Sequence, residues 1–317
     1  MVPYSLIEPV VEWACSTTRS GPNSQCAHAT IVLSGILSRV LEVAGAALAP
    51  RRALARVTEY QRTVPDLANA FDGYTIVVLS DFHHRHPFSE LRWLRHAVDA
   101  ANGVAPDVIM LLGDYASSFK ESPSISRRWY GEALPAMASE LSRLRARDGV
   151  IAVLGNHDYY ADADIVRNWL HAIGAHLLVN SAKCVVRSGN LLRIAGLDDI
   201  KKGKVDPLAG CGLINQPPTL LLCHEPDGVR RLDARLRVDV MLAGHTHGGQ
   251  IVFPWYGAPV TMSQTCGRRS AHGWIPNARA PLLVTRGLGE QLPLPIRIGS
   301  PPEILILRLC SARQQPA

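Results

Sequence analysis

Five short apolar runs, each closed by a polar residue, limit the folds open to this chain more than any other feature. The runs occupy 74–80, 107–113, 149–155, 219–223 and 238–244, and the residues that close them are Asp81, Asp114, Asn156, His224 and His245. Runs of this length, rich in Val, Ile and Leu and often bounded by Gly, are typical of strands buried on both faces. We therefore expect a sheet whose strands end in groups able to bind ligands.

Helical patterns lie between these runs. In segment 132–149, Leu134, Met137, Leu141 and Leu144 recur at helical spacing and Gly149 follows the end. Alternation of strands and helices predicts an α/β domain that binds its ligand beyond the carboxyl ends of the strands. Further strands, predicted at 191–197, 249–254, 281–285 and 303–309, would complete two sheets.

The composition of the chain narrows its class. With 317 residues, 47% of them apolar, it can bury a substantial core. The net charge of +6 comes from scattered arginines, whose pairs are too short for a nucleic-acid-binding arm, so no nucleic acid is expected as partner. Seven cysteines without a CxxC spacing argue against a disulfide framework and a Cys-rich zinc module, and reduced thiols fit the cytoplasm.

The first fifty residues differ from the rest. They begin with no positively charged region and hold no twin arginine before an apolar stretch, so a cleaved signal is not expected. Segment 29–49 is long enough to span a bilayer, but Arg39 and Glu42 interrupt it and its helical pattern is amphipathic. We predict an arm over 1–50 that lies on a membrane or on the core, a catalytic domain over 51–312 and a tail over 313–317. This organisation places the protein in the cytoplasm or at the periphery of the inner membrane.

Five motifs stand at the strand ends. They are SDFH (80–83), GDY (113–115), GNHD (155–158), CHEPD (223–227) and GHTHGG (244–249). In this order, over about 54–310, the chain resembles the calcineurin-like metallophosphoesterases. The resemblance implies a four-layer α/β/β/α sandwich of two mixed sheets flanked by helices. GLDD (196–199) and segment 287–304 further resemble a cell-envelope-associated branch of phosphodiesterases. Some members of that branch act on lipid-linked or nucleotide-sugar substrates.

The resemblance also implies a centre with two divalent metal ions. Hard oxygen and imidazole ligands with one bridging carboxylate suit such a pair, expected to be manganese, with zinc or iron as alternatives. A hydroxide between the ions would attack phosphorus in line. The implied ligands are Asp81, His83 and His247 for the first ion, Asn156, His224 and His245 for the second, and Asp114 as the bridge.

His157 matches the family histidine that stabilises the transition state or protonates the leaving oxygen. Many relatives pair this histidine with an acid or His three positions after the bridging Asp, where this chain has Ser117. Either another group orients His157, with Asp158 and Asp81 as the candidates, or the pKa of His157 is raised less than in those relatives.

Four residues are candidates to contact the substrate phosphate: His84, Arg85, His86 and Arg297. The open alternative for each of them is a role in a loop or in packing. The pattern predicts a metal-dependent phosphoesterase acting on a diester or monoester. A nuclease of the same superfamily would predict a coherent basic groove, which is not evident. A non-catalytic scaffold should have lost metal ligands, and none is missing.

Overall fold

The computed structural model describes residues 54–84, 91–118, 123–291 and 296–312. The predicted arm and tail, as well as Arg85 and His86, lie outside this part of the chain. Within the described ranges, none of the helices combines the length and the apolar character needed to cross a bilayer.

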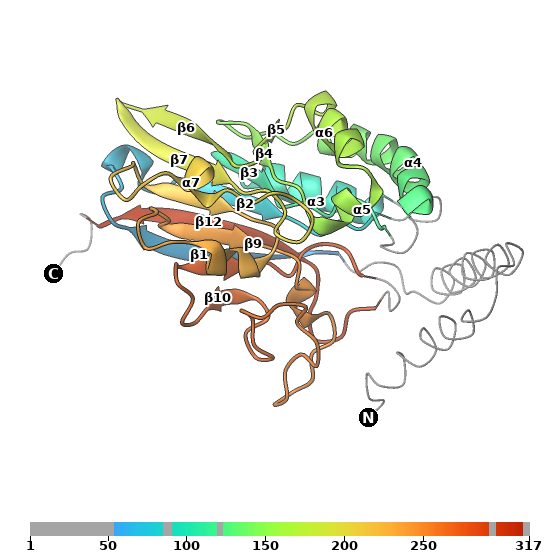
Figure 1. Cartoon of the computed structure of the whole chain (residues 1–317). Coiled ribbons are helices and arrows are strands. Elements are labelled where there is room, and N and C mark those ends of the chain that lie inside the picture. Colours follow the sequence, from blue (N-terminus) through green and yellow to red (C-terminus); the bar gives the residue numbers. More distant parts are fainter. Residues whose placement is uncertain (1–53, 85–90, 119–122, 292–295, 313–317) are drawn as a thin grey trace, which may run out of the picture. The chain divides into compact units, whose positions relative to one another are not determined.

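Two six-stranded mixed sheets form the centre of the described part of the chain (Figure 1). The first has the order β1 (Arg56–Val64), β12 (Glu303–Ser311), β2 (Thr75–Leu79), β3 (Val108–Leu111), β4 (Val150–Ala152), β5 (His176–Leu177). Only its β12–β2 pairing is antiparallel. The second has the order β10 (Gly273–Ile275), β11 (Leu282–Val284), β9 (Val240–Ala243), β8 (Thr219–Leu222), β7 (Asn190–Gly196), β6 (Ser181–Arg187). Both of its outermost pairings are antiparallel.

The period of two residues along each strand divides the apolar side chains between two layers of core. Ile76 and Val78 of β2 pack with Leu220 and Leu242 in the layer between the sheets. Val77 and Leu79 face the other way, onto the helices α3 (Arg92–Gly103), α4 (Pro123–Leu141) and α6 (Ala163–Ala172). A third cluster lies on the outer face of the second sheet, under α7 (Pro207–Cys211) and the 3-10 helix η3 (Pro226–Arg231). The predicted sandwich of two mixed sheets flanked by helices is confirmed.

Two predicted elements differ from the structure. The strand expected at 249–254 is wrong, because Gly248 and Gln250 have φ angles of 60° and 51°, which extended backbone cannot adopt. A 3-10 turn, η4 (His247–Gly249), leads into this segment, in which Ile251 and Phe253 form only isolated bridges. Helix α4 begins before the predicted segment, because Tyr130 extends its buried stripe, and it ends at Leu141.

The carboxyl ends of β2, β3, β4, β8 and β9 deliver the motif loops, and backbone hydrogen bonds join neighbouring loops. The amide of Asp81 donates to the carbonyl of Gly113 at 3.1 Å, and that of His83 donates to Asp114 at 3.1 Å. Gly244 donates to the carbonyl of His224 at 2.9 Å. The short α5 (Asn156–Ala161) begins directly at the GNHD motif. These bonds fix the motif residues against one another at one edge of the sheets.

Candidate metal centre

The seven predicted metal ligands come together at this edge, and all are buried. The most exposed of them is His245, at 5%. Burying carboxylates and imidazoles costs free energy unless charges or hydrogen bonds compensate them. The identity and spacing of the partners therefore decide what this site can hold.

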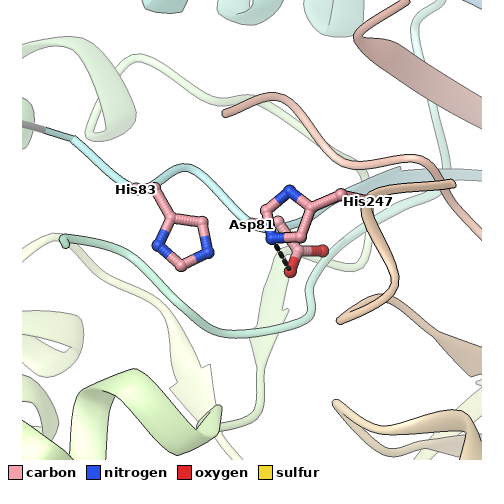
Figure 2. A group of neighbouring side chains, drawn as sticks. All are labelled: Asp81, His83 and His247. Carbon is pink, nitrogen blue, oxygen red and sulfur yellow. Dashed lines mark ion pairs between the residues drawn. The ribbon is translucent and has the colours of Figure 1, made fainter. Parts of the chain in front are cut away.

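The first cluster consists of Asp81, His83 and His247, whose ligand atoms lie within 4.8 Å of one another. Nε2 of His247 is 3.6 Å from Oδ1 of Asp81, and the two imidazole rings are 4.9 Å apart. Figure 2 shows these three side chains gathered from two loops, with the ion pair between His247 and Asp81 dashed. Two imidazoles and a carboxylate in this arrangement suit a divalent first-row metal.

The second cluster consists of Asp114, His224 and His245, again within 4.8 Å of one another. Oδ2 of Asp114 is 3.1 Å from Nε2 of His224 and 3.5 Å from Nε2 of His83. One carboxylate oxygen therefore faces both clusters. Beside it, Oδ1 of Asn156 is buried and accepts no hydrogen bond from the described residues. An orphaned buried acceptor is costly, and a bound cation would satisfy it.

Backbone carbonyls orient two of these imidazoles. Nδ1 of His224 lies 2.6 Å from the carbonyl oxygen of Leu112, and Nδ1 of His247 lies 3.3 Å from that of Gly289. A carbonyl only accepts, so each contact makes Nδ1 the donor and leaves Nε2 as the nitrogen that faces the site. Metal-ligating histidines are commonly fixed in this way.

The charges of the cluster perturb one another. Burial raises the pKa of Asp81 to about 6. Burial would also raise the pKa of Asp114, but the charge of His224 and the hydrogen bond between them hold it well below its usual value. Burial and the nearby Arg297 guanidinium lower the pKa of His247 to about 3. An anionic Asp114 and a neutral His247 are the protonation states that a metal requires.

The site also departs from ordinary backbone conformation. Left-handed φ angles are rare for residues other than Gly and cluster at functional sites. Close packing is a separate departure, since a Cβ added at Gly155 would stand 2.3 Å from Oδ1 of Asp114. Five of the seven ligand candidates have positive φ: Asp81 (52°), His83 (40°), Asp114 (56°), His245 (69°) and His247 (52°).

His157 is oriented by Ser118, a group that the sequence reasoning missed. Nδ1 of His157 is 2.9 Å from Oγ of Ser118 and 3.2 Å from its carbonyl oxygen. The Ser118 hydroxyl donates to the His157 carbonyl at 2.9 Å, so it accepts from Nδ1. The amide of His157 donates to Oδ1 of Asp114 at 2.9 Å. These contacts leave Nε2 as the nitrogen available for proton transfer.

The two residues expected to orient His157 have other roles. Asp158 accepts from the amides of Gly155 at 2.7 Å, Asp114 at 3.0 Å and Tyr115 at 3.1 Å, so it ties two motif loops together. Asp81 accepts from the amide of His245 at 3.0 Å. The prediction that either of them orients the His157 ring was therefore wrong.

Two of the predicted substrate contacts have neighbours within the fold, and their contact with substrate stays a prediction. The guanidinium of Arg297 donates to the carbonyls of His247 at 3.0 Å and Arg286 at 2.8 Å, which holds the His247 turn in place. His84 is buried, with its ring 6.4 Å from that of Trp93. The third, His86, lies outside the described residues.

Lys201 is a further residue at the site that the sequence reasoning did not single out. Its Nζ is 2.6 Å from Nε2 of His245. Asp199 accepts from the amides of Lys201 at 3.0 Å and Lys202 at 2.6 Å, which shapes the loop that carries this amine. The GLDD motif upstream is the only sequence signal that could have pointed to it.

Fold and site together define a hydrolase with clusters suited to metal ions. The sequence pattern of the calcineurin-like phosphoesterases matches residues 74–249, a segment that contains all seven ligand candidates. This chain belongs to the calcineurin-like phosphoesterase family, whose members depend on metal ions.

Curated relatives agree with this membership. The chain is 30% identical over 249 residues to the uncharacterized metallophosphoesterase YkuE of Bacillus subtilis, covering 77% of this chain and 82% of that protein. It is 28% identical over 241 residues to the phosphodiesterase YaeI of Escherichia coli, covering 74% and 82%. It is 30% identical over 291 residues to a transmembrane protein with metallophosphoesterase domain from Danio rerio, covering 86% and 61%.

Proposed function

We propose that this protein is a phosphodiesterase that uses two divalent metal ions. The observation that carries the proposal is the position of Asp114, whose Oδ2 is within 3.5 Å of a histidine from each cluster. One carboxylate shared by two sets of imidazoles is the arrangement that a metal pair needs. The similarity to the phosphodiesterase YaeI supports a diester substrate.

Each ligand set has a distinct composition. Asp81, His83 and His247 would hold the first ion, His224 and His245 with the amide oxygen of Asn156 would hold the second, and Asp114 would serve both. When bound, the two ions supply an activated water and neutralise charge on the phosphoryl oxygens. Oxygen and imidazole ligands without a thiolate favour manganese, iron or zinc, and we assign manganese because three of the seven side chains bind through oxygen.

His157 acts on the leaving group in this proposal. Its backbone is fixed by Asp114 and its Nδ1 by Ser118, so the ring presents Nε2 to the ester in one orientation. A histidine held in this way protonates the departing oxygen as a general acid. The dependence of its effect on the leaving group separates this role from stabilisation of phosphoryl charge.

Lys201 contacts the phosphoryl group in this proposal. Its amine lies at His245 on a loop braced by Asp199, so it is within reach of an ester bound at the second ion. A lysine there adds one positive charge toward the non-bridging oxygens of the ester.

The test uses the full chain after metal removal by a chelator. We expect no hydrolysis of bis-nitrophenyl phosphate without metal, and restoration by manganese ahead of zinc or iron. Nitrophenyl phosphate and single-stranded DNA serve as the competing monoester and nuclease substrates. Full activity in the metal-stripped protein would refute the proposal, and preferential cleavage of DNA would replace it with the nuclease.

A further inference from the structure

The loop that follows His247 exposes an unusual set of large apolar side chains. It leaves the η4 turn at Gln250 and returns to the sheet at β10; Figure 1 shows it in orange, extending away from the sheets beside β10. Trp255 is 91% exposed. Apolar side chains that gather on a surface mark interaction sites, whereas isolated ones are ordinary. The others exposed on this loop are Phe253, Tyr256, Val260 and Met262.

The loop is a defined structure that holds Trp255 outward. The amide of Phe253 donates to the carbonyl of Gly257 at 3.0 Å, and Gly257 donates back to Phe253 at 2.9 Å. The amide of Ala258 donates to Arg268 at 2.8 Å. At the tip of this turn Trp255 has φ 63°, a conformation that favours Gly or Asn. A bulky residue kept at a strained position indicates that its side chain serves a purpose other than the turn.

Arginines accompany the aromatic residues. The guanidinium of Arg268 lies 4.8 Å from the ring centre of Tyr256, and Arg269 donates to the carbonyl of Trp255 at 2.7 Å. Both arginines are exposed, and residues 250–272 contain no Asp or Glu. Together with Phe253 and Trp255 they line a cavity of about 320 Å³. Among the described residues neither arginine has an ion-pair partner, and aromatic side chains beside such arginines are suited to the interface of an anionic bilayer.

The loop packs directly on the turn that carries His247 of the first cluster. A Cβ added at Gly249 would lie 2.2 Å from that of Ala258, so the loop sits closely on this glycine. The hydroxyl of Thr246, the residue before His247, donates to the carbonyl of Ala271 at 2.7 Å. The exposed Ile298 also joins the base of the loop, since its carbonyl accepts from the amide of Val252 at 2.8 Å. A surface bound by this loop would lie next to the metal centre.

We infer that the 252–269 loop docks on an anionic phospholipid bilayer and that the ester hydrolysed belongs to a membrane lipid. The second half of this inference rests on the proposed phosphodiesterase function, and the docking surface does not. A bilayer accommodates both the aromatic tips and the two arginines, because the rings enter the headgroup region while the guanidinium groups stay with lipid phosphates. An apolar protein partner would have to desolvate both arginines without an acidic counterpart on the loop.

The test is sedimentation of the full chain with phosphatidylcholine vesicles that contain or lack phosphatidylglycerol. We expect binding only to the anionic vesicles, weakening as salt is raised. Trp255→Asn should abolish most of it, and Asn suits the left-handed backbone, so the variant is expected to fold. Removing both arginines (R268Q with R269Q) should weaken binding about 25-fold, from roughly fivefold for each basic residue near an anionic surface.

A matched control removes one exposed apolar side chain and one exposed arginine elsewhere. Ile214 is 66% exposed, and the amide of Ile214 donates to the carbonyl of Arg235 at 2.8 Å. The I214N/R235Q variant should bind vesicles as the unmodified chain does. Equal loss in this control would show a general effect of surface charge and overturn the inference.

Three further outcomes would overturn it. The first is that the unmodified chain fails to bind anionic vesicles. The second is that Trp255→Asn binds as well as the unmodified chain, whereas removal of residues 1–53 abolishes binding. Alternatively, Trp255→Asn could change only self-association in sedimentation velocity. Hydrolysis of a soluble diester by the unmodified chain is measured separately, so a chain that binds vesicles but cleaves no ester rejects the proposed function and leaves the docking surface standing.

Discussion

The core between the two sheets and the motif loops at their edge differ in the residues that they bury and in their backbone conformation. In the core, Ile76, Leu220 and Leu242 are fully or almost fully buried aliphatic side chains on regular strands. At the edge, Asp81 and Asp114 are equally buried, but they are charged groups on left-handed backbone. The core lowers the free energy of the fold, whereas the loops hold costly groups in place. The difference shows which part of the sequence serves stability and which serves chemistry.

The largest effect is expected from Asp114→Asn, because its carboxylate faces both clusters. Diester hydrolysis should fall at least roughly 10³-fold, beyond the loss from removing one stabilising donor. Any variant at one cluster only, such as His247→Ala, should retain more activity. Steady-state kinetics with saturating manganese checks this order. A smaller loss in Asp114→Asn than in His247→Ala would remove the distinction between a shared and a single-site ligand.

His157→Ala should lower the rate for an alkyl diester by about 10²–10⁴-fold if the histidine protonates the leaving oxygen. A nitrophenyl ester departs without a proton, so its rate should fall far less. Parallel assays of the two esters, with metal content measured for each protein, provide the test. Equal losses on both esters would assign His157 to phosphoryl charge instead.

Lys201→Met should lower kcat/KM for the diester by about 10–100-fold, the range expected for loss of one hydrogen bond to a charged group. Lys202→Met is the matched control, since Nζ of Lys202 lies over the Tyr160 ring at 5.2 Å. The two variants should differ in kinetics and agree in metal content. If Lys202→Met loses as much, the effect is one of general charge near the site.

Ser118→Ala should lower the rate for an alkyl ester about tenfold, because outer groups that orient a ligand or catalyst are typically worth 10–100-fold. Ser117→Ala is the comparison, since the Ser117 hydroxyl donates to the carbonyl of His83 at 3.2 Å and not to His157. Rates on alkyl and nitrophenyl esters are compared for both variants. A larger loss in Ser117→Ala would contradict the orientation read from the structure.

The smallest effect on catalysis is expected from a change in the core. Leu220→Ala should destabilise the fold by about 2–5 kcal/mol, since Leu220 is fully buried between the sheets. Its kcat/KM at low temperature should match that of the unmodified protein. Denaturant unfolding and kinetics on the same sample test both halves. A large loss of kcat/KM in the folded variant would show that the core and the site are coupled, and would contradict their separate contributions to stability and to catalysis.

The sequence pattern predicted the core strands and the gathering of the five residues that close them, because runs of aliphatic residues and their closing Asp, Asn or His are local signals. The other two ligand candidates, His83 and His247, came only from the resemblance to the calcineurin-like metallophosphoesterases. It did not predict the roles of Ser118, Lys201 and Asp158, since these contacts join loops distant in sequence. The expected strand at 249–254 failed for a related reason. Its apolar residues satisfy a strand pattern, but the glycines after His247 turn the chain into a surface loop.

The number of metal ions bound by each chain tests the central claim most directly. Equilibrium dialysis of the metal-stripped full chain against manganese, followed by elemental analysis, gives this number without any assay of activity. The account predicts two ions for the unmodified chain, one for His247→Ala and one for His224→Ala, and a marked loss of both for Asp114→Asn. A single ion in the unmodified chain, or two ions retained with full affinity in Asp114→Asn, would contradict it.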